Sequence, residues 1–445
     1  MKTLLHSSMW VSITLLSILI PITLNAAEVS KAEIEAWLGT EITVDQPPEG
    51  ASFDSSNVSQ LYPWIAPGLR EEFEFAEVSV EIQQTLDYPG HQSYQDASQQ
   101  FAGQASLGPK GQLENYLAGK PFSDAQITSA TPQQAGLMVG WNQFHRWQFM
   151  GYKVDELSMT YIDSTPAAAP LDENQGLVGG GNSTRRLTQS YHRVYLSKLS
   201  WLGDQQFRVD VPDSDSRFFK DYISFLSPFD VKGTSFVVER LNDPFADDQV
   251  NIYSPTERRV RRFSAKERAD RFMGSEATLD DFEGFSGRVL DYHWRYVGQK
   301  KIIYVADSHD GIPKGHGPHS RLPLDRWQVR NCHVVEVKSI LDDHPYGSRF
   351  LFIDSQSGTV GLSLVFDHQD VLWKTFSGVY KGPAPQNGLD SPMETSVQSW
   401  RGQFNVDRKT NYATVVQSLT PTEHPHMKPA QIRRVFSVSN LTSGR

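Results

Sequence analysis

The sequence predicts an α+β protein dominated by an antiparallel sheet. Apolar and polar residues alternate in many short runs, such as the one from Val360 to Phe366, and this period of two is typical of strands. Turn signatures separate the runs: Gly358 precedes this run, and Asp367 to Asp370 follow it. Hairpins in succession favour an antiparallel meander over strands that are joined by crossover helices.

Three further stretches are predicted as strands. Each places apolar side chains on one face and charged or polar side chains on the other, as a half-buried sheet requires. These stretches are residues 73–75, 207–211 and 290–294.

We expect the elements to form one large domain over residues 27–445. Two stretches interrupt the strand pattern and are predicted as surface loops, because turn-forming residues crowd there. The first is the glycine-rich stretch 174–184, and the second is the stretch 308–323, which is rich in proline, glycine and histidine.

Capping signals predict two helices in the N-terminal third of the chain. Ser30 and Glu33 form a capping box, so a short helix should begin there. Thr131, Pro132 and Gln134 supply a cap, a first-turn proline and a capping-box partner for a second helix. The second helix carries one apolar face, which can serve the core or cover a cavity.

The N-terminus has the features of a secretory signal peptide over residues 1–26. Lys2 precedes an apolar run from Met9 to Leu24, and a small residue follows at Ala26. The run is shorter than the roughly 20 residues that cross a bilayer. No cysteine follows it for lipid attachment. We therefore expect a periplasmic protein that is cleaved near Ala26 and is not lipidated.

Composition narrows the classes of partner. The formal net charge of −10 argues against nucleic acid or acidic lipid as a broad partner. Cys332 is the single cysteine, so stability must come from burial rather than from an intrachain disulfide. Aromatic residues make up 11% of the chain, which indicates large apolar surfaces that the fold or a ligand must cover.

The segment from Asn251 to Trp294 concentrates charge and aromatic side chains. A predicted strand carries four arginines: Arg258, Arg259, Arg261 and Arg262. A helix capped by Ser264 should follow and lead through Asp270. An acidic group comes next: Asp280, Asp281 and Glu283.

Three interpretations of these charges remain open from the sequence. The acidic group can satisfy one pair of the arginines in a structural ion-pair network. The arginines can instead recognise an anionic head group or a docking partner. Acid–base catalysis by the carboxylates is the third interpretation, and it needs positioned partners that spacing alone does not show.

Other candidate motifs lack the spacing that their chemistry needs. Four histidines lie in or near the second predicted loop, but none forms a ligand pair on a helix or a knuckle: His309, His316, His319 and His333. The Gly179–Thr184 stretch lacks the lysine of a phosphate-binding loop, and no Gly-x-Ser-x-Gly occurs. We therefore assign no catalytic residue, metal or cofactor.

Several motifs together resemble a bacterial family of exported proteins, the domain of unknown function 1329 family, which is related to outer-membrane lipoprotein-sorting proteins of the LolA/LolB type. The resemblance covers about residues 113–381. The motifs that carry it are Leu117–Phe122, Trp141-Asn142, Pro228–Thr234, the Arg258–Trp294 block with Phe272–Ser275, His344–Asp354 and Leu372–Lys374.

The resemblance implies a strongly curved antiparallel sheet, an incomplete β-barrel, with helices against its concave apolar face. Such a face shields acyl chains from water. The candidate ligand-binding residues are Trp141, Met138, Phe272, Met273, Phe282 and Phe285. Members of the family resemble partners of exporters of the resistance-nodulation-division type and of outer-membrane proteins.

The sequence as a whole favours a periplasmic carrier or chaperone for a lipid or another hydrophobic molecule, without enzymatic activity. Two other classes stay open. One is a non-catalytic assembly factor of an outer-membrane or efflux complex, which would dock through the arginines. The other is a hydrolase of an envelope lipid or glycan, which would use the acidic group.

Overall fold

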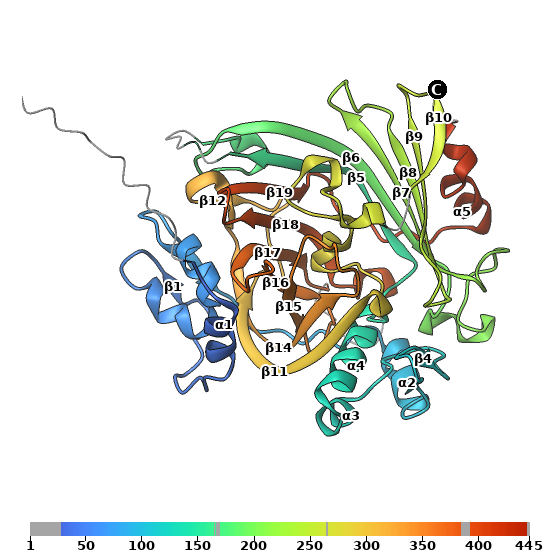
Figure 1. Ribbon diagram of the computed structural model, residues 1–445, viewed down its shortest axis with the longest axis horizontal. Coiled ribbons are helices and arrows are strands. Elements are labelled where there is room, and N and C mark those ends of the chain that lie inside the picture. The colour runs from blue at the N-terminus through green and yellow to red at the C-terminus, as the bar shows by residue number, and fades with distance from the viewer. Residues whose placement is uncertain (1–27, 164, 166–169, 264–265, 384–391, 443–445) are drawn as a thin grey trace, which may run out of the picture.

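The computed structural model describes residues 28–163, 165, 170–263, 266–383 and 392–442 (Figure 1). The predicted signal peptide and Ser264, the predicted helix cap, lie outside these residues. In the described part of the chain, no helix is long and apolar enough to cross a membrane.

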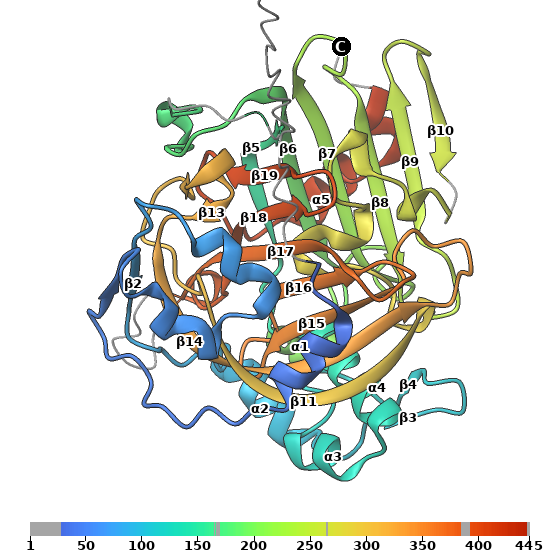
Figure 2. The ribbon, with the colours of Figure 1, turned by 60° about the vertical axis from the view of Figure 1, so that its left-hand side comes forward.

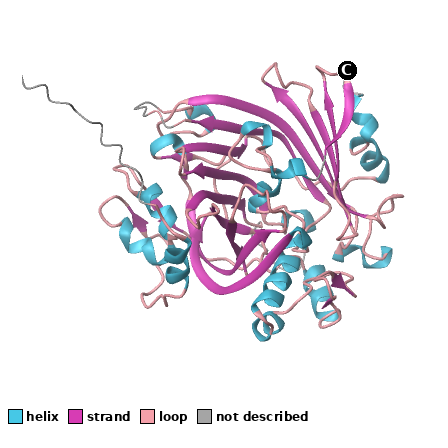
Figure 3. Cartoon of the chain, in the orientation of Figure 1, coloured by secondary structure: helices cyan, strands magenta, loops and turns pink. Residues whose placement is uncertain are grey.

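A single sheet of 15 strands dominates the described residues, and Figure 3 shows most helical segments around its edge and a few in front of its strands. Its path runs β1 (Ser52–Phe53), β2 (Val80–Ile82), β14 (Arg326–Ser339), β15 (Ser348–Asp354), β16 (Val360–Phe366), β17 (Leu372–Lys381), β18 (Ser399–Asp407), β19 (Tyr412–Ser418), β5 (Gly151–Ile162), β6 (Ser183–Tyr195), β7 (Arg217–Ser227), β8 (Ser235–Leu241), β9 (Gln249–Ser254) and β10 (Arg259–Phe263). Strand β11 (Tyr292–Tyr304) pairs with β14 off this path. The terminal strands β1 and β10 do not pair with each other among the described residues, so the sheet is open.

The predicted antiparallel meander is confirmed. Strands β14 to β19 pair in chain order, and β5 to β10 continue the sheet from β19. Both predicted turns join neighbouring strands: the Gly358 N–H donates to the Asp354 carbonyl at 3.0 Å, and the Asp370 N–H donates to the Asp367 carbonyl at 3.2 Å. Strand β2 pairs with β14 in parallel, and the other described pairs are antiparallel.

The helices and turns outside the main sheet are short. The α-helices are α1 (Lys31–Leu38), α2 (Gln92–Gln100), α3 (Asp124–Ser129), α4 (Pro132–Phe144) and α5 (Pro429–Val435). Two pairs of short strands complete the β-structure: β3 (Ser106–Leu107) with β4 (Leu113–Glu114), and β12 (Gly315–His316) with β13 (Leu322–Pro323). The 3₁₀ turns are η1 (Val58–Trp64), η2 (Pro67–Phe73), η3 (Glu173–Gln175), η4 (Ser200–Gln205), η5 (Lys266–Ala269), η6 (Phe272–Gly274), η7 (Leu279–Gly284), η8 (Val289–Asp291), η9 (Pro318–Ser320), η10 (Met393–Thr395) and η11 (Val438–Thr442).

Both predicted helix starts are confirmed. Ser30 and Glu33 form the capping box of α1, and Thr131 and Gln134 form that of α4. Helix α4 packs closely on β11, because a Cβ atom added to Gly136 would lie only 2.8 Å from the backbone nitrogen of Arg295. A larger side chain at this position would push the helix away from the sheet.

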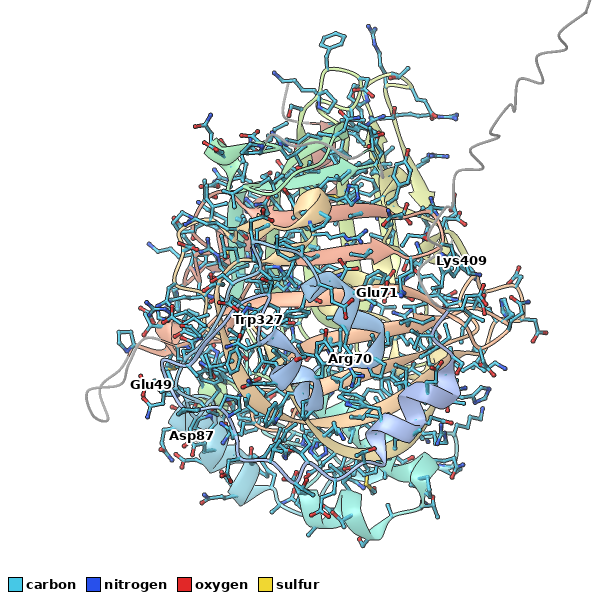
Figure 4. All side chains as sticks on the ribbon, turned by 90° about the vertical axis from the view of Figure 1, so that its left-hand side faces the viewer. Glu49, Arg70, Glu71, Asp87, Trp327 and Lys409 are labelled. Atoms are coloured by element: carbon cyan, nitrogen blue, oxygen red, sulfur yellow. The ribbon has the colours of Figure 1, made fainter. Side chains whose placement is uncertain are left out.

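Both faces of the sheet are covered where β15 lies. Alternation along β15 sends Phe350 and Phe352 to one face, which we call the outer face, where α1, η1 and η2 pack. Leu351 and Ile353 point to the opposite, inner face and pack with α4. Figures 2 and 4 show the N-terminal elements lying over the outer face, and Figure 4 labels Arg70 and Glu71 of η2.

Two predicted strands are wrong. Phe73 is fully buried at the end of η2, and its ring packs 5.4 Å from that of Trp327. The alternation of phenylalanine and glutamate there belongs to a 3₁₀ turn and the residues after it, not to a strand. Residues 207–211 form no named strand, because Gln206 and Phe207 adopt positive φ angles of 56° and 60° that turn the chain sharply. A short apolar alternation does not by itself distinguish a strand from a folded loop.

The two predicted surface loops contact each other rather than extending separately into solvent. The N–H groups of Val178 and Gly179 donate to the Gly315 carbonyl at 2.9 and 3.2 Å. The Gln417 side chain joins the loops by donating to the carbonyls of Gln175 and Pro313 at 2.8 and 2.6 Å. His316 and His319 are consequently buried. The second loop therefore forms part of the core.

Candidate functional site: the cavity beneath the internal segment

Residues 266–291, which join β10 to β11 through η5 to η8, lie against the inner face of the sheet; we call them the internal segment. Figures 1 and 2 show this segment in yellow in front of the strands. The Gly284 N–H donates to the Gln403 side chain at 2.8 Å, and the Glu276 N–H donates to Thr414 Oγ1 at 3.0 Å. Short 3₁₀ turns, rather than the α-helices that the resemblance implies, therefore cover this part of the sheet.

Buried ion pairs hold the internal segment to the rest of the protein. Asp281 Oδ1 lies 2.6 Å from Arg349 Nη1 of β15, and Asp281 Oδ2 accepts a hydrogen bond from the Tyr346 hydroxyl at 2.8 Å. Glu276 lies 2.9 Å from the ammonium group of Lys374 on β17. These contacts place two carboxylates of the segment against cations of two different strands.

The remaining carboxylates of the acidic group are also paired. Asp280 accepts from Arg268 Nε at 2.9 Å and from the Tyr292 hydroxyl at 2.6 Å. Glu283 accepts from Arg146, just beyond α4, and from the Tyr152 hydroxyl. The acidic group therefore belongs to a set of buried ion pairs in which each carboxylate contacts a different cation.

The cations keep Asp280 and Glu283 ionised. Burial raises the pKa of Asp280, but Arg268 and the hydrogen bond from Tyr292 outweigh it, so the pKa lies below its usual value. Burial likewise raises the pKa of Glu283, and Arg146 with Arg193 more than reverses that shift. A buried carboxylate held this way is poorly suited to donating or accepting a proton at neutral pH.

One open interpretation paired the acidic group with the strand arginines, but in the structure Asp280, Asp281 and Glu283 contact other arginines: Arg268, Arg349 and Arg146. Arg258, Arg259, Arg261 and Arg262 are exposed at the far end of the sheet, and Arg259 pairs with Glu257 at 2.9 Å. Asp270, which was expected to join the network, is exposed as well. Asp281 and Glu283 pair with Arg349 and Arg146, which are 68 and 137 positions away in sequence, whereas Asp280 pairs with Arg268 at 12 positions.

A small cavity of about 70 Å³ lies between the internal segment and strands β5 to β8, β18 and β19. Most of its lining is apolar: Leu157, Met159, Phe219, Ile223, Val238, Phe272, Ala277, Leu279, Phe282, Trp400 and Val416. At one side Arg193 and Asp221 form a bidentate ion pair, with N–O distances of 2.7 and 2.8 Å. The cavity is therefore mainly apolar, with one ion pair at its edge.

Two amide groups in the cavity wall carry unpaired polar atoms. Gln189 Oε1 and Asn405 Nδ2 are buried and have no hydrogen-bond partner among the described residues. Buried polar atoms are normally paired with protein, water or ligand. These amides therefore give the apolar cavity two positions that suit a polar group of a bound molecule.

The structure separates the six predicted ligand-binding residues. Phe272 and Phe282 line the cavity: Phe272 packs 5.9 Å from Phe236, and Phe282 packs 4.8 Å from both Tyr191 and Trp400. The other four predicted residues lie outside the lining of this cavity: Met138, Trp141, Met273 and Phe285. Phe285, Trp141 and Met138 belong to the core beneath α4.

Sequence reasoning missed the strand residues of the cavity. Gln189, Tyr191 and Arg193 alternate along β6 and all face it. Their period of two was present in the sequence. Nothing local distinguished a polar face turned toward a cavity from one turned toward solvent.

His344 lies beside the ion pair of Asp281 and Arg349. Its Nδ1 accepts a hydrogen bond from the Tyr346 N–H at 3.0 Å, and its ring packs 5.3 Å from the ring of Tyr346. Burial and then the charge of Arg349 lower the pKa of His344 to about 4, although Asp280 and Asp281 oppose the shift. The imidazole is therefore neutral in the folded protein at neutral pH.

We predict that His344 makes the protein less stable in mild acid. The unfolded chain binds a proton at this histidine near pH 6.5 and the folded chain only near pH 4, so the stability contribution is lost as the pH falls between these values. From pH 7 to pH 5 this loss is about 2 kcal/mol. Denaturant unfolding of the wild type and of His344→Asn at both pH values measures it. An equal pH dependence in both proteins would contradict the prediction.

Comparison with known families decides the classification of the chain. Residues 52–442 match the family model described as "Protein of unknown function (DUF1329)". The chain belongs to this family. The match confirms the resemblance and extends beyond the region 113–381 on which it was based. No match is found among curated proteins.

Solved structures align with this DUF1329 protein at low sequence identity. A DUF1329 family protein from Desulfovibrio piger is 15% identical, and the alignment covers 70% of this chain and 100% of the other, with a TM-score of 0.46. A domain described as an outer membrane lipoprotein-sorting protein, from Vibrio parahaemolyticus, is 14% identical over 70% and 99% of the chains, with a TM-score of 0.44. A LolA superfamily protein from Nitrosomonas europaea is 12% identical over 70% and 100%, with a TM-score of 0.37.

Proposed function

We propose that this DUF1329 protein is a non-catalytic periplasmic carrier or chaperone for a lipid or another hydrophobic molecule. In this proposal the open sheet is half of a barrel, and its concave inner face holds the apolar part of the ligand. The chain is exported by its signal peptide and serves an envelope exporter of the resistance-nodulation-division type together with an outer-membrane protein.

The apolar cavity beneath the internal segment is the observation that carries the proposal. Ligand sites in proteins usually enclose several hundred Å³ and are lined mainly by apolar side chains with a few polar groups. The present cavity has this lining but only about 70 Å³ of space. Phe272 and Phe282 are two of the aromatic side chains that line it, and both are only partly buried. We infer that the two rings stand where the ligand's apolar part binds.

Exchange of these rings for a ligand requires the internal segment to shift. Burying a few hundred Å² of acyl chain provides several kcal/mol at about 25 cal/mol per Å². That amount supports reversible binding without a covalent step. Gln189 and Asn405 then offer hydrogen bonds to a polar group of the ligand.

The geometry of the acidic group favours a carrier over a hydrolase. Asp280, Asp281 and Glu283 are buried, and each accepts hydrogen bonds from a cation and a hydroxyl group. A catalytic carboxylate must reach the substrate or its attacking water. These carboxylates instead bind the internal segment to the protein.

The proposal is tested by identifying what the protein carries. We expect mass spectrometry of organic extracts of the mature protein, purified from a periplasm, to show an enriched apolar species. The emptied protein should also take up a fluorescent fatty acid. Absence of both results would contradict the proposal.

We predict that filling the cavity weakens fatty-acid uptake about tenfold. Val238 of β8 lines the cavity, so the aromatic ring that Val238→Phe introduces would occupy space for the ligand. Overpacking of this kind typically costs about 1–3 kcal/mol, and a loss of that size in binding free energy corresponds to about 5- to 150-fold in affinity. Titration with the fluorescent fatty acid measures the change.

Val237→Phe is the matched control. Val237 is the neighbour on the same strand, is fully buried, and faces Tyr253 and Leu441 on the other side of the sheet. The Val237→Phe variant should destabilise the fold about as much as Val238→Phe does and leave fatty-acid uptake nearly unchanged. Equal losses of uptake in the two variants would show that the cavity is not the binding site.

A further inference from the structure

Phe229, in the turn between β7 and β8, is the most exposed large apolar side chain among the described residues. It is 94% exposed, and Leu226 at the end of β7 is 40% exposed. A lone exposed apolar residue is common on protein surfaces, but one exposed almost completely at the tip of a hairpin contributes nothing to the fold. Phe229 needs another explanation.

The turn between β9 and β10 lies beside the turn that carries Phe229. Ser235 pairs with Tyr253 across β8 and β9, so both turns leave the sheet at the same end. A Cβ atom added to Gly233 would lie 3.2 Å from Cγ of Pro255, which places the turns in contact. Figures 1 and 2 both show the two hairpins projecting together at the upper end of the protein. We call these two turns and the adjoining strand ends the tip.

The tip is rich in exposed cations. It carries Lys232 on the first turn and four arginines on the second hairpin, all exposed: Arg258, Arg259, Arg261 and Arg262. Two acidic residues of the tip are paired, since Asp230 lies 2.6 Å from Arg185 and Glu257 lies 2.9 Å from Arg259. The tip therefore has a positive balance on a chain whose formal net charge is −10.

Charge and shape together favour a membrane surface over a protein as the partner. A protein partner is usually met by a packed apolar patch with a polar rim. The tip instead presents an isolated aromatic ring among long cationic side chains. This combination suits an anionic lipid surface, where the ring enters the interface and the cations lie over the head groups.

We propose that the tip docks the protein on membranes that contain anionic lipid, with Phe229 inserted among the head groups. The arginines that the sequence singled out then act in membrane attachment rather than in an internal ion-pair network. This docking is independent of what the cavity holds. It also limits the sequence-based expectation about acidic lipid: the net charge disfavours broad attraction, whereas a local patch can still bind.

Co-sedimentation of the mature protein with lipid vesicles tests the proposal. We expect binding at low ionic strength to vesicles of mixed phosphatidylglycerol and phosphatidylcholine, little binding to phosphatidylcholine alone, and release by salt. Each cation near such a surface contributes about fivefold in affinity, so Arg258→Glu combined with Arg262→Glu should weaken binding at least about 25-fold. Phe229→Ser should weaken it several-fold without changing the thermal melt.

Two control variants separate the tip from general surface effects. Phe245→Ser removes another exposed ring, 54% exposed, in the loop at the opposite end of β8. Lys301→Glu combined with Lys338→Glu reverses two exposed charges on β11 and β14, away from the tip. We expect binding within about twofold of the wild type for the first control and a much smaller loss than in the tip variant for the second.

Three results would overturn the proposal. The first is absence of binding to anionic vesicles at low salt. This result would overturn the proposal even if the tip arginines were needed to bind a partner protein. The second is equal binding to anionic and zwitterionic vesicles. The third is a loss in the control variants as large as that in the tip variants.

Discussion

Asp281→Ala is expected to lower the free energy of unfolding by about 3–5 kcal/mol, because it leaves a buried guanidinium group without its counter-charge. Asp281 is 0% exposed and Arg349 is 1% exposed. Arg349 Nη2 already has no hydrogen-bond partner among the described residues, so the loss of Asp281 removes its main compensation. The Tyr346 hydroxyl and the N–H of Thr278 also lose an acceptor.

Denaturant unfolding of purified protein measures this effect. Asp281→Asn keeps the side-chain volume and one acceptor, so it should be destabilised less than the alanine variant. Glu257→Ala removes an exposed carboxylate that pairs with Arg259, and such surface pairs contribute little to stability. An unchanged melt for Asp281→Ala, accompanied by loss of a hydrolytic activity, would instead support the hydrolase hypothesis.

Phe285→Ala is expected to cost about 3–5 kcal/mol of stability while leaving fatty-acid uptake nearly unchanged. Phe285 is buried, and its ring lies 5.2 Å from that of Tyr292 and 5.4 Å from that of Trp294. The guanidinium carbon of Arg349 lies 5.3 Å from the ring centre. Truncation therefore opens a hole in the core beneath α4, outside the cavity.

Phe282→Ala is the comparison variant, three residues away on the same segment. Phe282 is only partly buried and lines the cavity, so truncation should cost less stability and change uptake more. Unfolding curves and fatty-acid titrations on both variants give the two measurements. The reverse pattern, with uptake controlled by Phe285, would place the ligand beneath α4 rather than beneath Phe272 and Phe282.

The elements that were predicted correctly depend on neighbours in sequence. A capping box needs residues three positions apart, and the turn at Gly358 needs only the preceding four. Alternation along β16 indicates a strand from that segment alone, although both faces of the strand are buried in the structure. Such patterns need no knowledge of the partner strand, which is why the meander was predicted and confirmed.

Local patterns failed where the chain turns or where partners are distant. The alternation at residues 207–211 was that of a strand, but the positive φ angles of Gln206 and Phe207 fold the chain into a loop. One interpretation of the sequence paired the acidic group with the nearby strand arginines, whereas Asp281 pairs with a residue 68 positions away and Glu283 with one 137 positions away. Spacing along the chain carries no information about contacts of this kind.

The sequence by itself determined the family, the β-rich fold class and the positions of the turns and helix caps discussed above. These features depend on motifs and on local backbone preference. Only the tertiary structure decided the roles of charge and aromatic residues in the Asn251–Trp294 block. The sheet brings Arg349, Lys374 and Arg146 to the carboxylates of the internal segment, and it turns the strand arginines outward to the tip. Burial separates these two sets, because a charge inside the protein requires a partner and a charge at the surface does not.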